Sequence, residues 1–140
     1  ETHAVFGGEH SAHYYFSEFF NADSGILAAM HILAALGNQE KPLSELMASY
    51  ERYESSGEIN TRLESQEEQQ ERTQAVLDAF ADRTESVDTL DGVTVQLRDT
   101  PAWFSVRASN TEPLLRLNVE APTKDEVTAL VTEILDIIRK

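Results

Sequence analysis

Two stretches of this sequence, residues 102–108 and 114–121, alternate between apolar and polar side chains. Successive side chains point to opposite faces of a β-strand, so the pattern predicts two strands that each bury one face. The polar parity then places Arg107 and Arg116 on the face turned away from the core. The buried parity is expected to consist of Phe104, Val106, Leu115, Leu117 and Val119.

Helices and further strands complete this pattern. Ser65 with Glu68 forms a capping box that opens a helix to about Arg83, and Thr123 with Glu126 opens a final helix in the same way. The order β-α-β-β-β-β-α predicts an α+β fold, in which an antiparallel four- to five-stranded sheet carries two helices on one face. The expected strands are Ile59–Leu63, Val87–Leu90, Val93–Leu97, Ala102–Ala108 and Leu114–Ala121.

Two local signals refine this C-terminal part. Asp91-Gly92, between two of the expected strands, is a strong hairpin signal. In the helix after Ser65, the run Glu67–Glu71 is interpreted as a solvated face. The buried stripe of that helix is expected at Thr73, Val76, Leu77 and Phe80.

The first fifty residues have a different character. We expect a short strand at His3–Phe6, followed by a glycine-rich polar loop. Asp23 and Ser24 are suited to cap a helix over residues 25–36 that is apolar nearly all round. Such a helix belongs inside a larger body. We therefore expect a strand-loop-helix remnant of an α/β domain whose packing partner lies outside this chain.

The expected domain organisation follows from these changes in pattern. Residues 1–53, which end with a second short helix over 42–51, form the remnant, and residues 59–140 form the α+β domain. Residues 54–58 (ESSGE) are typical of a linker and are expected to act as a hinge.

Composition excludes several classes of partner. The formal net charge of −14 disfavours nucleic acid and anionic membranes as partners. No apolar run is long enough to span a bilayer. The absence of cysteine removes disulfides, thiolate metal sites and a cysteine nucleophile, and fits a reducing compartment.

The loop Ser109-Asn110-Thr111 is a candidate phosphate site. It lies between the strands that carry Arg107 and Arg116, and it offers hydroxyls, an amide and backbone N–H groups. Guanidinium forks beside such donors suit a phosphate. The alternative is an ordinary β-turn flanked by exposed arginines.

The loop over residues 9–13 (EHSAH) is a second candidate. Glu9, Ser11 and the two histidines could grip sugar hydroxyls, which need donors and acceptors close together. Three alternatives remain: a metal site at His10 and His13, a hydrolase nucleophile at Ser11, or a plain polar surface.

Both loops together resemble the α-D-phosphohexomutase family. Residues 7–16, GGEHSAHYYF, are similar to its sugar-binding loop G-E-x-S-G-H, with Ala12 in place of the usual glycine. Residues 107–113, RASNTEP, resemble the phosphate-binding loop of its last domain. The likeness covers the whole chain and implies the end of the third domain plus the complete fourth domain of a phosphomannomutase/phosphoglucomutase. Phosphoglucosamine mutase is the alternative within the family.

The resemblance implies a function for each loop. These enzymes interconvert hexose 1-phosphate and hexose 6-phosphate through a phosphoserine and a bisphosphorylated sugar. Glu9, Ser11 and His13 would contact the sugar, with His13 suited to proton transfer. The non-reacting phosphate would be held by Arg107, Ser109, Asn110, Thr111 and Arg116.

The resemblance also implies what other parts of the enzyme supply. The family's phosphoserine loop and its Asp-x-Asp-x-Asp loop for Mg²⁺ have no counterpart in this sequence. We therefore expect no catalytic serine and no metal ligand here, N-terminal domains of the same enzyme and a hexose phosphate as partners, and a glucose 1,6-bisphosphate-type activator. The chain alone is expected to be inactive and the enzyme cytoplasmic. The rival from another class is a non-enzymatic acidic interaction module.

Overall fold

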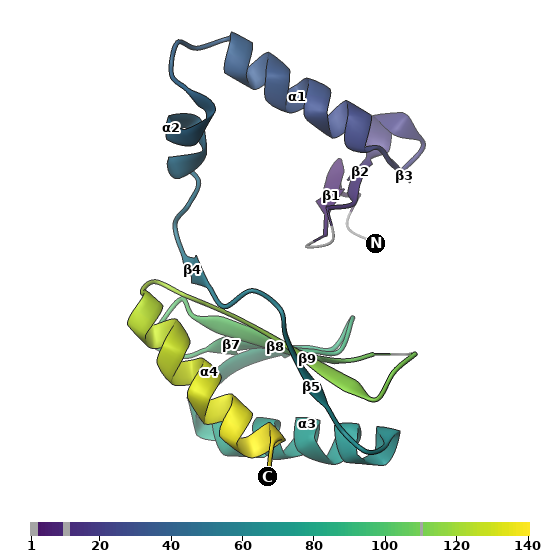
Figure 1. Cartoon of the computed structure of the whole chain (residues 1–140), viewed down its shortest axis with the longest axis vertical. Helices are drawn as coiled ribbons and strands as arrows, with labels where there is room; N and C mark the ends of the chain where they lie inside the picture. Colours follow the sequence, from purple (N-terminus) through teal and green to yellow (C-terminus); the bar gives the residue numbers. More distant parts are fainter. Residues whose placement is uncertain (1–2, 10–11, 110) are drawn as a thin grey trace. The chain divides into compact units, whose positions relative to one another are not determined.

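The computed structural model describes residues 3–9, 12–109 and 111–140, which form two compact units that divide between Tyr50 and Glu51 (Figure 1). The first unit contains β1 (Phe6–Gly8), β2 (Tyr14–Phe16), the 3-10 helix η1 (Ser17–Phe19), β3 (Ala22–Asp23), α1 (Gly25–Gly37) and α2 (Leu43–Ala48). The second contains β4 (Glu54–Ser55), β5 (Ile59–Arg62), α3 (Gln66–Phe80), η2 (Ala81–Arg83), β6 (Thr84–Asp88), β7 (Val93–Leu97), β8 (Trp103–Ala108), β9 (Leu114–Ala121) and α4 (Lys124–Ile138).

The second unit is an antiparallel sheet of the order β4-β9-β8-β7-β6, in which β5 also pairs with β9. The predicted α+β architecture is therefore confirmed, and α3 and α4 lie on the same face of the sheet (Figure 1). The expected alternation is also present, because the apolar parity of β8 and β9 is buried and the polar parity is only half-buried.

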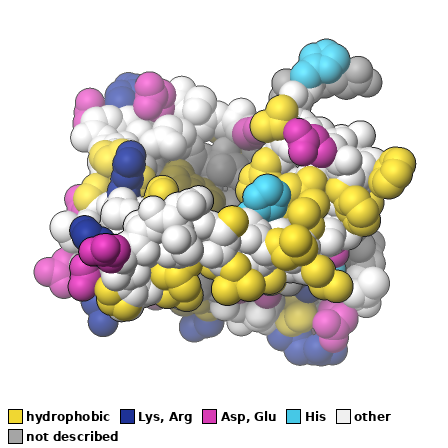
Figure 2. Space-filling model, turned by 90° about the horizontal axis from the view of Figure 1, so that it is seen from above, with side chains coloured by type: hydrophobic (Ala, Val, Ile, Leu, Met, Phe, Trp, Pro, Cys, Tyr) yellow, Lys and Arg dark blue, Asp and Glu magenta, His cyan; other side chains and the backbone are white. Residues whose placement is uncertain are grey.

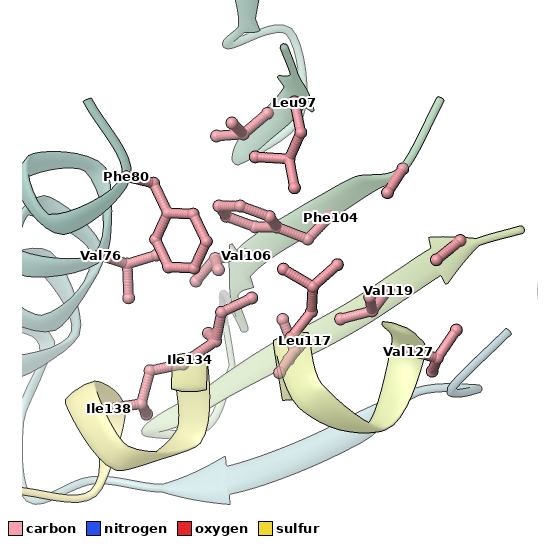
Figure 3. Packing of buried hydrophobic residues seen from close by; sticks show 14 of the residues in the cluster. Val76, Phe80, Leu97, Phe104, Val106, Leu117, Val119, Val127, Ile134 and Ile138 are labelled. Carbon is pink, nitrogen blue, oxygen red and sulfur yellow. The ribbon is translucent and has the colours of Figure 1, made fainter. Parts of the chain in front are cut away.

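The core lies between the sheet and the two helices. Phe104 and Phe80 are fully buried and pack edge to face, with ring centroids 4.9 Å apart. The labelled side chains of α3 and α4 point toward those of the strands (Figure 3). The buried cluster consists of Val76, Phe80, Val95, Leu97, Ala102, Phe104, Val106, Leu115, Leu117, Val119, Ala121, Val127, Leu130, Ile134 and Ile138.

The predicted capping residues stand at the starts of both helices. Ser65 Oγ accepts the N–H of Glu68, and Thr123 and Glu126 exchange the two bonds of a capping box. The hairpin at Asp91-Gly92 is present, but β6 ends at Asp88, earlier than expected. The longer loop leaves Leu90 94% exposed.

The segment expected as a linker is held to the sheet. Glu54 and Ser55 pair with β9 as the short strand β4. Ser56 N donates to Val119 O, and Val119 N donates to Ser56 Oγ, each at 2.9 Å. A two-residue strand carries no periodicity, so the sequence pattern did not reveal it. We now expect any hinge to lie before Glu54.

The first unit begins with an antiparallel hairpin. The strand expected at His3–Phe6 lies later, at Phe6–Gly8, and pairs with β2, which in turn pairs with β3. Tyr14 Cδ1 would lie 3.4 Å from a Cβ on Gly8. The two glycines are thus part of β1, and Glu9, Ala12 and His13 lie in the chain between β1 and β2.

Helix α1 is open to solvent along its apolar side chains. Ile26, Met30 and Leu33 are 79%, 60% and 65% exposed. Figure 2, which looks at the side where α1 lies in Figure 1, shows hydrophobic side chains at the surface. Among the described residues, none of the helices combines the length and the apolar composition of a membrane span.

Candidate functional site

The two arginines singled out by the alternation are direct neighbours across β8 and β9. Arg107 and Arg116 are register partners, so their side chains leave the same face of the sheet. That face is opposite the buried parity, which α3 and α4 cover (Figure 1). Like charges directly opposite each other destabilise a sheet unless anions offset them.

Each arginine has an acidic neighbour. Arg107 Nη1 lies 2.7 Å from Asp91 Oδ2, with side chains 42% and 72% exposed. Arg116 Nη1 lies 3.8 Å from Glu58 Oε2. Among the described residues, the buried Nε of Arg116 has no hydrogen-bond partner. Exposed ion pairs of this kind contribute little stability, so exchanging either carboxylate for another anion would cost little.

The loop after β8 directs N–H groups toward one hydroxyl. Ser109, which is 8% exposed, closes the loop by donating its N–H to Leu114 O at 2.8 Å. Its Oγ lies 3.4 Å from the N–H nitrogen of Thr111 and 3.3 Å from that of Glu112. Both bonds are long, so these donors are only weakly satisfied. Asn110 lies outside the described residues.

Gln69 of α3 also contacts this loop, and the sequence analysis did not identify it. The interpretation of Glu67–Glu71 as a solvated face is wrong at this position, because Gln69 is only 3% exposed. It lies one helical turn before Thr73, so extending the apolar stripe backward by four residues was the signal that could have found it.

In the first unit, the hairpin loop holds Glu9 beside an aromatic hydroxyl. Tyr15 OH donates to Glu9 Oε1 at 2.7 Å, and this hydrogen bond raises the pKa of Tyr15. Glu9 N also donates to His13 O at 3.0 Å. The loop therefore brings two of the three predicted sugar-binding residues together. Ser11 and His10 lie outside the described residues.

His13 is paired with Asp23, which sequence analysis placed only at a helix cap. His13 Nδ1 lies 2.7 Å from Asp23 Oδ2, and Tyr14 N donates to Asp23 Oδ1 at 2.9 Å. The hydrogen bond with Asp23 raises the pKa of His13, and the bond with His13 lowers the pKa of Asp23. The cap itself is made by Ser24, whose Oγ accepts the N–H of Leu27. Nδ1 of His13 thus lies against a carboxylate, which favours the protonated form of the ring.

Two further features bear on this loop. Ala12 has a φ of +65°, a left-handed conformation that glycine adopts more readily. Within residues 3–9, 12–109 and 111–140, no group of three or more His, Cys, Asp or Glu side chains could hold a metal ion.

Comparisons with known proteins match both units. Residues 1–53 match the family model for the phosphoglucomutase/phosphomannomutase alpha/beta/alpha domain III, and residues 58–137 match the model for the C-terminal domain of the same proteins. A solved phosphoglucomutase/phosphomannomutase family protein from Burkholderia thailandensis shares the fold, with a TM-score of 0.74 at 24% identity over 99% of this chain and 29% of that one.

Curated relatives extend the match. A phosphomannomutase of Methanocaldococcus jannaschii is 39% identical over 140 residues, which is 100% of this chain and 30% of the relative. Phosphohexose mutases of Xanthomonas campestris pv. campestris are 38% identical over 96% of this chain and 29% of the relative. A probable phosphoglucosamine mutase of Methanopyrus kandleri is 31% identical over 100% of this chain and 30% of the relative. The chain thus spans about 30% of the length of these relatives, and it belongs to the phosphoglucomutase/phosphomannomutase family.

Proposed function

We propose that this chain supplies substrate-binding residues of a phosphohexomutase that interconverts hexose 1-phosphate and hexose 6-phosphate. Arg107, Arg116 and the loop over 109–111 bind the phosphate that does not react. The loop over 9–13 binds sugar hydroxyls through Glu9, Ser11 and His13. A cytoplasmic location and a preference for mannose or glucose over glucosamine phosphates are parts of this proposal.

The observation that carries the proposal is the direct opposition of Arg107 and Arg116 beside a loop of converging N–H donors. A phosphate placed there would offset the repulsion between the two guanidinium groups. Its oxygens would also give the N–H groups of Thr111 and Glu112 a charged acceptor in place of the distant Ser109 hydroxyl. Phosphoryl transfer depends mostly on such positioning and charge neutralisation.

The hairpin loop supports the second half of the proposal. Sugar hydroxyls both donate and accept, and the loop offers a carboxylate at Glu9 and an imidazole at His13. Because Asp23 holds Nδ1 and raises the pKa of His13, Nε2 becomes a stronger base. We assign to Nε2 the exchange of a proton with the sugar hydroxyl that gains or loses a phosphoryl group.

The remaining chemistry is assigned to other parts of the enzyme. A phosphoserine passes its phosphoryl group to the sugar, the bisphosphorylated sugar turns round, and its other phosphate returns to the serine. The described residues do not fit a Mg²⁺ site, since they hold no suitable cluster of ligands. In this proposal the described residues therefore perform no step through Mg²⁺.

A phosphate titration tests the proposal. With ¹⁵N-labelled chain, inorganic phosphate should shift the backbone amide signals of Ser109, Thr111 and Glu112 most. Arg107→Ala should abolish these shifts, because it removes the exposed guanidinium beside the loop. Arg83→Ala is the matched control, since Arg83 also forms an exposed ion pair, with Glu133 at 2.8 Å, but lies on another element.

The outcomes separate the proposal from its rival. Saturable shifts that Arg83→Ala preserves and Arg107→Ala removes support a phosphate site. A flat titration together with concentration-dependent self-association would instead support an acidic interaction module that associates through α1.

A further inference from the structure

Gln69 makes two hydrogen bonds with a loop more than forty residues away in the sequence. Its side-chain Nε2 donates to Glu112 O at 3.3 Å and to Leu114 O at 3.0 Å. The side chain comes from the first half of α3, and the residue is 3% exposed. A buried amide that donates both of its hydrogens to one loop fixes the position of that loop relative to the helix.

These bonds matter because the loop contains carbonyl oxygens as well as N–H groups. An anion is attracted by N–H groups and repelled by carbonyl oxygens, so an anion-binding loop must direct its carbonyls elsewhere. The N–H and the carbonyl of Glu112 have different partners. The N–H lies near Ser109 Oγ, and the carbonyl accepts from Gln69.

The neighbouring carbonyls are directed in the same way. Pro113 O accepts from Leu63 N at 2.8 Å, and Leu114 O accepts from both Ser109 N and Gln69. Glu112 O accepts from Leu114 N at 2.8 Å as well as from Gln69. Three successive carbonyls, those of residues 112–114, are therefore bound within the domain. Leu63 uses its backbone for this, which any residue can supply, whereas the bonds from α3 depend on the side chain of Gln69.

We propose that Gln69 is a positioning residue for the phosphate-binding loop: its amide holds the carbonyl oxygens of Glu112 and Leu114 toward α3, so that the loop presents N–H groups to the anion. This inference rests on the proposed function of that loop. It makes Gln69 a determinant of phosphate affinity that acts without touching the phosphate.

The test compares two substitutions on the same helix. Gln69→Leu removes both donors and puts an apolar side chain of similar size in their place. Gln74→Leu is the control, because Gln74 is exposed and its side chain donates to Asp78 Oδ1, at 2.8 Å, one turn along α3. Each chain is titrated with inorganic phosphate, and amide hydrogen exchange is followed at Ser109 and Glu112.

The expected result is specific to the loop. Gln69→Leu should weaken phosphate binding about tenfold and speed exchange at Ser109 and Glu112 about tenfold, the effect expected when two buried hydrogen bonds are lost. In Gln69→Leu, amide hydrogen exchange in α4 should stay near that of the unsubstituted chain. In Gln74→Leu, both the phosphate affinity and the exchange of the loop amides should stay near those of the unsubstituted chain. If Gln69→Leu does not fold, Gln69→Glu keeps the shape, replaces the donors with acceptors, and should give the same two changes.

Other outcomes overturn the inference. A purely structural Gln69 would lower the unfolding midpoint and leave both the phosphate affinity and the loop exchange of the folded chain unchanged. Equal effects of Gln69→Leu and Gln74→Leu would point to the helix as a whole. If even the unsubstituted chain does not bind phosphate, the proposed function fails. The rate of amide hydrogen exchange at Ser109 alone then decides whether Gln69 positions the loop.

Discussion

Gly92 lies directly against the carbonyl oxygen of Val106: a Cβ atom at Gly92 would be only 2.8 Å from it. Gly92 also has a φ of +73°, which other residues rarely adopt. This close approach holds the turn between β6 and β7 beside β8, where Asp91 reaches Arg107. Gly92 thus determines the surroundings of Arg107, a candidate phosphate-binding residue.

Gly92→Ala should therefore destabilise the second unit by more than about 2 kcal/mol, because strain at positive φ adds to the clash with Val106 O. Gly57→Ala is the control, since Gly57 has a φ of +63° but no atom within 4 Å of its Cβ position. It should cost only about 1 kcal/mol. Urea unfolding followed by the fluorescence of Trp103, the one tryptophan of the sequence, measures both. Equal losses would mean that the contact with Val106 carries no energy.

The pair of His13 and Asp23 predicts a pH dependence in the first unit. The pKa of His13 is raised by Asp23, so the stability that the pair contributes is complete below the ordinary histidine pKa of about 6.5 and is lost as the pH rises through the raised value. The pKa of Asp23 is lowered, so on the acid side the contribution is complete above about 3.9 and is lost as the pH falls through the lowered value.

Asp23→Asn should consequently lower the titration midpoint of His13, measured by NMR at its ring protons. Glu9 also raises the pKa of His13, but its effect is smaller than that of Asp23, so Glu9→Gln should lower the midpoint less. Glu18→Gln, which removes a carboxylate elsewhere in the unit, should leave it nearly unchanged. An unaltered midpoint in Asp23→Asn would show that the pair does not form in solution.

The buried parity of β9 predicts a large stability difference between two leucines. Leu117 is 1% exposed and Leu90 is 94% exposed. Leu117→Ala should destabilise the second unit by about 2–5 kcal/mol through lost burial and a residual cavity, whereas Leu90→Ala should change stability by less than about 0.5 kcal/mol. Trp103 fluorescence in urea again reports the result. Similar losses in both variants would contradict the burial of Leu117 on the inner face of β9.

The chain alone should show no mutase activity. Its sequence has no counterpart of the family's phosphoserine loop, so no group is available to donate the first phosphoryl group. An assay with glucose 1-phosphate, Mg²⁺ and glucose 1,6-bisphosphate should give no turnover above background, with a complete phosphomannomutase as the positive control. Robust turnover by the purified chain would refute this assignment of roles.

The sequence was informative where one face of an element is buried. Alternation along β8 and β9 predicted which face Arg107 and Arg116 share, and the motifs at Ser65 and Thr123 predicted the starts of both helices. These features depend on residues close together in the chain, whose spacing reflects the geometry of a strand or a helix turn.

Features that depend on distant residues could not be read in this way. Strands β2, β3 and β4 have two or three residues each, too few for a periodic pattern. Asp23 carries the usual signature of a helix cap, and only the folded hairpin brings it to His13. Gln69 lies in a polar run, and its burial depends on a loop that follows three strands later in the chain.

The pairing of residues 54–56 with β9 has a practical consequence for dissecting the chain. A shortened version that starts at residue 58, where the match to the C-terminal domain begins, would lack β4 and the bonds between Ser56 and Val119. The freed N–H and C=O groups of β9 would then form an open edge on which a second molecule could add a strand. Expression of the second unit by itself should therefore start no later than Glu54.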